Sequence, residues 1–305
     1  MKMEQSARYV VRRKERTSIV NSIVDNSMKY LLLLCALLTV FIVASIIVYV
    51  SKNGINVFKE ITVEGFFTSD YWSPDEGEFG ILAFWRGTLI LTLLAITIGG
   101  ALGVLCAIYM SKFAPKKIRE VMKFAIDIFV GIPSVVYGFI GLTVIVPLIR
   151  EVFPDSTGFG FLPAAIILSI MILPTVISIS EASISSVDKS YEEASYALGA
   201  TKVQTVFSVV LPSALPGIIT AIILAMARAL GETMAVQMVI GNTPQVVNSL
   251  LEPTITLTTG IVMDMGSCEF GSTWSNALFM MATVLLMVSI LLILIIRLIQ
   301  RRQVS

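Results

Sequence analysis

The sequence consists mainly of long apolar runs separated by short polar segments. A helix needs about 20 apolar residues to cross the roughly 30 Å hydrocarbon layer of a bilayer. Five runs reach this length without a charged residue: Tyr30–Val50, Gly87–Met110, Ile128–Ile149, Phe159–Ser180 and Asn276–Ile296. A sixth run, Ser213–Ile240, is longer and contains one arginine and one glutamate. The pattern predicts an all-α, polytopic membrane protein with six transmembrane helices.

One further apolar segment, Glu252–Met263, does not fit a membrane span. It is too short to cross the bilayer, and it contains Pro253 and Gly260, which weaken a helix. We expect this segment to be extramembrane or re-entrant.

Composition supports a membrane protein and narrows the chemistry. Hydrophobic residues make up 56% of the chain and charged residues 14%, against about 25% charged residues in soluble domains. The absence of histidine excludes histidine-based acid–base catalysis, histidine metal ligands and a Ser-His-Asp triad. Cys35, Cys106 and Cys268 form no CxxC motif, so we expect them to be small hydrophobic residues. We predict no catalytic residue, no metal site and, from the net charge of +1, no nucleic-acid partner.

The basic residues are unevenly divided between the two sides of the six predicted spans. One side carries 17 of the 22 lysines and arginines, in the arm 1–29, in segments 111–123 and 181–212, and from Arg297 onward. The other side carries four, and its loop 241–275 has none. Cytoplasmic loops are enriched in lysine and arginine. The asymmetry predicts a protein of the cytoplasmic membrane with both termini in the cytoplasm.

The polar segment after the first span, Ser51–Arg86, is rich in acidic and aromatic residues. We expect it to be external, so residues 30–86 form the first transmembrane helix and an external loop. Its aromatic residues fit an interfacial belt on a solvated loop. Docking of an external partner is the alternative.

Prolines and glycines interrupt the third and fourth predicted spans. Pro133 and Pro147 lie in the third, and Pro163 and Pro174 in the fourth. Each proline removes a backbone hydrogen bond that lipid cannot replace, so these turns must be buried against neighbours or line a cavity. Close helix packing and a transport pathway both explain the pattern.

The segment 181–212, between the fourth and fifth spans, has the pattern of two short amphipathic helices around Gly199. Apolar residues recur at helical spacing before and after that glycine: Tyr191, Ala194, Ala197 and Leu198, then Val203, Val206 and Val210. A compact, half-apolar helical hairpin is suited to insertion into a groove of another protein.

Seven residues in this segment align with a known signature: Glu193, Ala194, Ser195, Gly199, Val209, Leu211 and Pro212. They resemble the EAA motif of ABC importer permeases, which is EAA, three residues, Gly, nine residues and then I-x-L-P. Ser195 replaces the second alanine and Val209 the isoleucine. The resemblance implies a type I ABC importer permease fold over residues 87–300, with 181–212 docking on an ATPase subunit. We call 181–212 the EAA-like loop.

The fifth predicted span contains the two intramembrane charges, Arg228 and Glu232. Four residues apart, they are expected on one face of a helix near the bilayer centre. An intramembrane charge costs at least about 3 kcal/mol unless it is shielded. The pair fits a structural ion pair or an anion-binding site with its own counter-charge, because guanidinium presents a fork of donors suited to oxyanions.

The residues around this pair carry a second resemblance. Residues 226–236, Met-Ala-Arg-Ala-Leu-Gly-Glu-Thr-Met-Ala-Val, are similar to a stretch of phosphate ABC permeases, in PstC subunits more than in PstA subunits. Residues 131–138 and the long first external loop resemble PstC as well. The resemblance implies phosphate translocation by a heterodimer with a PstA-like permease, two PstB-like ATPases and an external PstS-like phosphate-binding protein.

Two other functions fit parts of the pattern. A permease for sulfate, molybdate or another oxyanion would have the same EAA-like loop. A secondary anion transporter would also have six spans and an intramembrane charge, but would not need that loop. The sequence has no Gly-rich phosphate loop followed by Lys-Ser/Thr. We therefore expect ATP and Mg²⁺ to be used by a partner ATPase, with no cofactor on this chain.

Overall fold

The computed structural model describes the backbone of residues 2–304 and the side chains of residues 26–298. The chain divides into two compact units, which meet between Lys52 and Asn53. The first unit is part of one uninterrupted helix, α1 (Lys2–Ile55). This helix contains the first predicted span.

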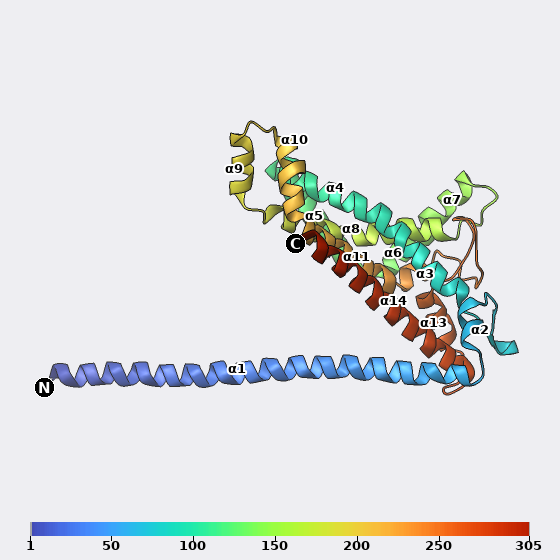
Figure 1. The fold of residues 1–305 in the computed structure, drawn as a ribbon, viewed down its shortest axis with the longest axis horizontal. Coiled ribbons are helices and arrows are strands. Elements are labelled where there is room, and N and C mark those ends of the chain that lie inside the picture. Colours follow the sequence, from blue (N-terminus) through green and yellow to red (C-terminus); the bar gives the residue numbers. More distant parts are fainter. Residues whose placement is uncertain (1, 305) are drawn as a thin grey trace. The chain divides into compact units, whose positions relative to one another are not determined.

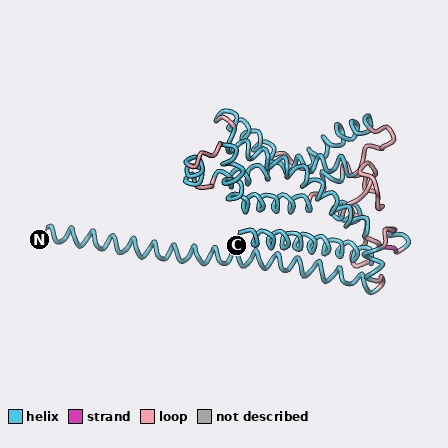
Figure 2. The backbone as a smooth tube through the Cα atoms, turned by 45° about the horizontal axis from the view of Figure 1, so that its top comes forward, coloured by secondary structure: helices cyan, strands magenta, loops and turns pink. Residues whose placement is uncertain are grey.

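The second unit is a bundle of helices with a two-stranded hairpin at one end (Figure 1). Helices run through most of the bundle, and the loops gather at its two ends (Figure 2). Its elements are η1 (Asn56–Lys59), α2 (Val63–Thr68), β1 (Trp72–Ser73), η2 (Pro74–Glu76), β2 (Glu78–Phe79), α3 (Leu82–Ala95), η3 (Ile96–Gly100), α4 (Ala101–Ile108), η4 (Tyr109–Phe113), α5 (Lys116–Gly131), α6 (Ser134–Ile140), η5 (Gly141–Ile145), α7 (Val146–Val152), α8 (Phe161–Ser185), α9 (Lys189–Ala197), α10 (Lys202–Thr205), η6 (Val206–Val210), α11 (Leu211–Gly231), α12 (Met234–Gln237), α13 (Leu257–Met265) and α14 (Thr273–Val304).

Six helical segments of the described chain are long and apolar enough to cross a membrane, which agrees with the predicted number. They are Asn26–Lys59, Leu82–Phe113, Ser134–Val152, Phe161–Ser185, Lys202–Gly231 and Thr273–Leu298. Residues 257–263 of the segment that was expected not to span lie in α13, a helix of nine residues.

Two predicted span boundaries were wrong, each because the helix is interrupted. The third span was expected from Ile128, but α5 ends at Gly131 and a new helix begins at Ser134. Ile132 precedes Pro133 and has an extended backbone, since the proline ring disfavours the helical conformation of the residue before it. The fifth span was expected to continue to Ile240, but α11 ends at Gly231.

Helix α8 lies at the centre of the bundle, with 15 of its 25 residues buried. Glycines of the second span allow it to approach α8 closely. A Cβ atom built on Gly99 would lie 2.8 Å from the Ser169 carbonyl oxygen, and one on Gly103 would lie 2.7 Å from Val176 Cγ1. Small residues at helix interfaces bring backbones together in membranes, where packing drives association.

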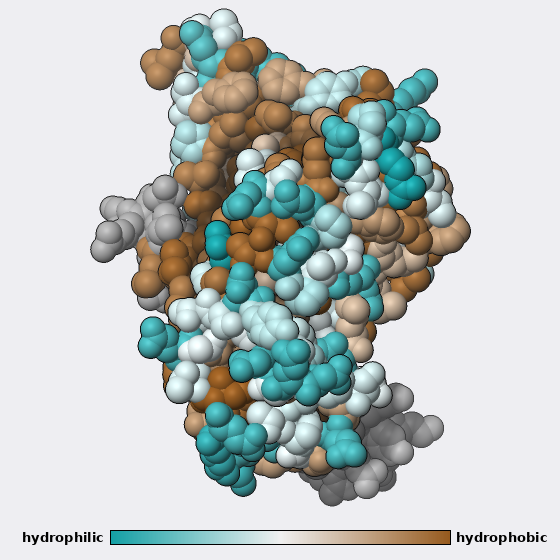
Figure 3. Space-filling model, turned by 90° about the vertical axis from the view of Figure 1, so that its right-hand side faces the viewer, coloured by the Kyte–Doolittle hydropathy of each residue, from teal (hydrophilic) through white to brown (hydrophobic). Residues whose placement is uncertain are grey.

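The end of the bundle formed by α2, the hairpin and α13 has its own apolar core, around Phe66, Phe84 and Leu257. The hairpin pairs Trp72 with Phe79. The Asp264 carboxylate joins α13 to its surroundings, because Trp72 Nε1 and Trp274 Nε1 both donate to its Oδ2 at 2.9 and 3.2 Å. Figure 3 shows many hydrophilic residues over this end and apolar surface beside them. Helices α9 and α10 lie at the opposite end (Figure 1).

Candidate functional site

Arg228 lies in the last turn of α11, where the helix dipole favours a cation. Its side chain is half-buried, and Nη1 donates to Thr175 Oγ1 of α8 at 3.2 Å. Thr175 follows Pro174, the proline inside α8. The structure therefore places the guanidinium between two central helices, with a neutral hydroxyl as its hydrogen-bond acceptor.

Glu232 does not share a helix face with Arg228, which corrects the prediction made from their spacing. Helix α11 ends at Gly231, and Glu232 has an extended backbone. Its Oε1 accepts hydrogen bonds from the backbone N–H groups of Thr233 and Ala235, both at 3.2 Å. The carboxylate thus binds free amides at the start of α12, where the helix dipole stabilises negative charge.

Arg228 and Glu232 also form no ion pair in the structure. The described side chains form two salt bridges, Lys112–Glu192 and Lys123–Glu181, and neither involves Arg228 or Glu232. Sequence spacing alone did not indicate the two hydroxyl groups at this site: Thr175 accepts from Arg228, and Thr258 Oγ1 donates to the Glu232 carbonyl oxygen at 3.0 Å. The guanidinium is therefore a cation without a bound carboxylate in the described chain.

The EAA-like loop forms two short helices on either side of Gly199, α9 and α10, as predicted. The second, α10, continues through the π-helical turn η6 into α11 and belongs to the fifth span. Val206 and Val210 are buried, so this segment packs against the bundle. Of the motif residues, Val209 and Leu211 are half-buried and Pro212 lies in the first turn of α11.

Gly199 ends α9 in the left-handed conformation, with φ of 82°. The Ala200 N–H bonds to the Ser195 carbonyl and the Gly199 N–H to the Tyr196 carbonyl, at 3.2 and 2.9 Å. These two bonds form the Schellman motif, in which a glycine closes a helix. A capping box of Thr201 then starts α10, so the corner between the helices is defined by local chemistry.

At its start, α9 is capped by Asp188, whose side chain accepts from the Ser190 N–H at 2.8 Å. This backbone hydrogen bond, together with the Ser190 side chain, holds the pKa of Asp188 below its ordinary value of 3.8. A depressed carboxyl pKa means that the cap stabilises the helix at neutral pH. The stabilisation is lost as pH falls from the ordinary value through the folded-state pKa.

The face of α9 that was expected to dock on another protein is exposed. Tyr191 is 57% and Leu198 is 90% exposed, and Ala194 and Ala197 are exposed as well. Glu193 is exposed and has no ion-pair partner among the described side chains. Of the motif residues on α9, Glu193 and Ala194 thus lie on an accessible surface, whereas Ser195 is half-buried.

Comparison with known proteins agrees with this architecture. Residues 99–305 match the family described as "Binding-protein-dependent transport system inner membrane component". This chain belongs to that family. The permease is 42% identical to the probable ABC transporter permease protein YqgH of Bacillus subtilis, over 88% of each chain. It is 32% identical to the phosphate transport system permease protein PstC of Xylella fastidiosa, over 76% of this chain and 77% of that protein.

Solved structures show the same fold for the permease. A chain of a bacterial alginate ABC transporter aligns with a TM-score of 0.61 at 19% identity, covering 89% of this chain and 94% of that chain. A chain of the MetNI methionine ABC transporter aligns with a TM-score of 0.52 at 22% identity, covering 71% and 92%. The predicted fold, a six-span permease of the ABC importer type, is confirmed.

Proposed function

We propose that this permease carries inorganic phosphate across the cytoplasmic membrane as part of an ATP-driven importer. The observation that supports this most directly is Arg228, near the end of α11, whose guanidinium forms no ion pair with any carboxylate of the described side chains. A guanidinium forms paired, charge-assisted hydrogen bonds with oxyanions. Similarity to a phosphate permease of Xylella fastidiosa supports phosphate as the anion.

In this proposal Arg228 contacts the anion. Glu232 does not contact it but stabilises the chain at the break between α11 and α12. The Glu232 carboxylate accepts from the amides of Thr233 and Ala235 and so holds the start of α12 next to the end of α11. Among the described side chains no carboxylate forms an ion pair with Arg228, so the donors of its guanidinium that Thr175 does not take can bind an anion. Release of the anion then depends on conformational change in the bundle.

The partners are proposed from the family and from the exposed face of α9. A PstA-like permease would complete a heterodimer, and similarity to a PstA 2 protein of Mycobacterium bovis supports a related second subunit. Two PstB-like ATPase subunits would bind ATP and Mg²⁺ and dock on Tyr191, Glu193 and Leu198. An external PstS-like protein would deliver phosphate, and this chain would hold no cofactor.

The first test is the identity of the anion. The co-purified complex, reconstituted in vesicles with its binding protein, is expected to take up labelled phosphate only with ATP. Unlabelled phosphate should compete, and sulfate should not. Uptake of labelled sulfate in place of phosphate would support the alternative of another oxyanion. Uptake that needs no ATP would support a secondary transporter.

The second test is orientation, with both termini in the cytoplasm and residues 51–86 outside. Asp70 is an exposed position in that loop, whereas Ser69 is half-buried and accepts a hydrogen bond from the Tyr71 N–H. In a background without Cys35, Cys106 and Cys268, Asp70→Cys should react with an impermeant thiol reagent in intact cells. The matched control, Lys117→Cys, is also exposed and should react only after permeabilisation. The reverse pattern would invert the topology.

A further inference from the structure

The end of the second span touches both helices of the EAA-like loop. In η4, Lys112 Nζ lies 2.5 Å from Glu192 Oε1 of α9. The next residue, Phe113, presents its ring to Lys202 of α10, with the ammonium nitrogen 5.1 Å from the ring centroid. Two adjacent residues of one span therefore bind α9 and α10.

The Lys112–Glu192 ion pair is shielded from solvent. The two side chains are 12% and 20% exposed. An exposed ion pair contributes little to stability, because water and salt screen its charges. In a shielded pair the attraction is stronger, and removing one partner leaves an unpaired charge, which destabilises the protein. This pair therefore constrains where α9 lies.

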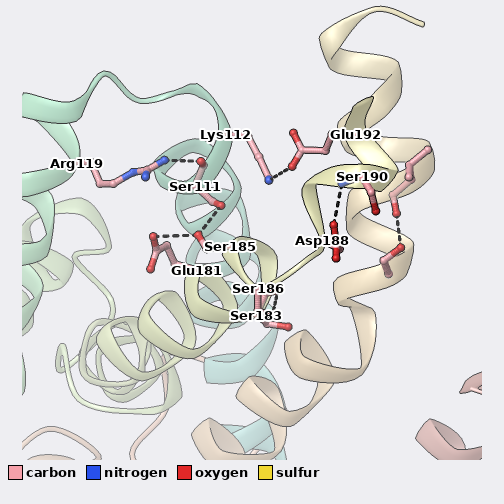
Figure 4. A network of polar contacts seen from close by, with 12 residues as sticks. Ser111, Lys112, Arg119, Glu181, Ser183, Ser185, Ser186, Asp188, Ser190 and Glu192 are labelled. Atoms are coloured by element: carbon pink, nitrogen blue, oxygen red, sulfur yellow. Dashed lines mark hydrogen bonds and ion pairs between the residues drawn. The ribbon is translucent and has the colours of Figure 1, made fainter. Parts of the chain in front are cut away.

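The same turn is bound to the rest of the bundle by a set of polar contacts (Figure 4). Arg119 of α5 donates to two carbonyl oxygens of η4, those of Met110 at 2.6 Å and Ser111. Ser111 Oγ lies 3.0 Å from Ser185 Oγ of α8, and Ser185 donates to Glu181 at 3.3 Å. We call this set, with Lys112, Glu192 and Lys123, the loop-end network.

Lys123 of α5 completes the network through its ion pair with Glu181, at 3.2 Å. The network thus joins α5, η4, α8 and α9. Helix α9 has a second attachment one turn after Glu192, where Ser195 Oγ lies 2.9 Å from Thr205 Oγ1 of α10. Its apolar side chains stay exposed while its polar side chains bind the bundle.

We propose that the Lys112–Glu192 ion pair makes α9 move together with the second span, so that displacement of α9 reaches the bundle. Lys112 and Glu192 are positioning residues in this proposal. It rests on the proposed function, since the force on α9 would come from the docked ATPase. Without the pair, α9 would stay attached to the bundle through Ser195 and through the chain on either side. The second span would then follow a movement of α9 only in part.

The test uses the full complex with spin labels on Lys189 of α9 and Leu105 of α4. Both positions are exposed and lie outside the loop-end network. Lys112→Gln should broaden the distance distribution between the labels, and the charge exchange Lys112→Glu/Glu192→Lys should narrow it again. Lys117→Gln removes one exposed lysine near the network and serves as the matched control. An unchanged distribution in Lys112→Gln would overturn the proposal.

The second measurement is labelled phosphate taken up per ATP hydrolysed. Lys112→Gln should lower this ratio by about twofold to thirtyfold, the range for side chains along a coupling network, while the ATPase still co-purifies. A broadened distribution with an unchanged ratio would overturn transmission through this pair. If the unmodified complex carries sulfate and not phosphate, the proposed substrate is wrong. The proposal about the Lys112–Glu192 pair is then tested by the same ratio, measured as labelled sulfate taken up per ATP hydrolysed.

Discussion

Replacing Arg228 by glutamine is expected to reduce phosphate uptake by about a hundredfold or more while the complex still assembles. The guanidinium would lose two charge-assisted hydrogen bonds to the anion, each contributing about 1.5–3 kcal/mol. Assembly should be preserved, because no carboxylate is bound to Arg228 in the described chain and none is left unpaired. Labelled-phosphate uptake in vesicles, with co-purification as the control for assembly, measures the effect.

Companion variants separate contact with the anion from packing. Arg228→Lys should also fail, since an ammonium group does not reproduce the planar fork. Thr175→Val removes the hydroxyl that accepts from Nη1 at 3.2 Å, and it should weaken uptake less than loss of the charge. Glu232→Gln should be milder than Arg228→Gln, because an amide oxygen can still accept from the Thr233 and Ala235 N–H groups.

The outcome that would contradict this assignment is near-normal uptake in Arg228→Gln/Glu232→Gln. The substrate would then rest on similarity to phosphate permeases alone.

Replacing Gly199 by leucine is expected to release the ATPase from the complex while the six spans still insert. A left-handed backbone costs an L-residue about 1–2 kcal/mol, which is about a fivefold to thirtyfold change in an equilibrium. The strain falls on the corner that follows α9, because φ at Gly199 is 82°. Co-purification of the ATPase measures docking, and membrane fractionation measures insertion.

Two further substitutions at this position identify the cause of the loss. Gly199→Asn is the matched control, since asparagine tolerates the left-handed region, and it should retain most of the ATPase. A Cβ atom at Gly199 would meet no atom within 4 Å beyond its chain neighbours, so the expected cause is the backbone conformation and not crowding at Cβ. Unchanged co-purification and transport in Gly199→Leu would show that the corner is not needed for docking.

Much of the fold could be predicted because its determinants are local. Apolar runs such as Tyr30–Val50 and Asn276–Ile296 are long enough to cross a bilayer, and both lie in spans of the structure. The corner at Gly199 was also evident, because a glycine after an amphipathic stretch is a local signal for the end of a helix. Where a span was misplaced, at Ile132 and at Gly231, the apolar pattern continued through a break in the helix.

The sequence by itself determined the six spans, the all-helical class and the site of the exposed helix, since hydropathy and helical spacing act over a few turns of chain. Only the tertiary structure decided which groups meet. Lys112 and Glu192 are 80 positions apart, and Arg228 and Thr175 are 53 apart. Glu232 was expected to face Arg228 but binds the amides of α12, because the end of one helix leaves N–H groups of the next unpaired. Such partners depend on how distant helices pack, and no local pattern specifies them.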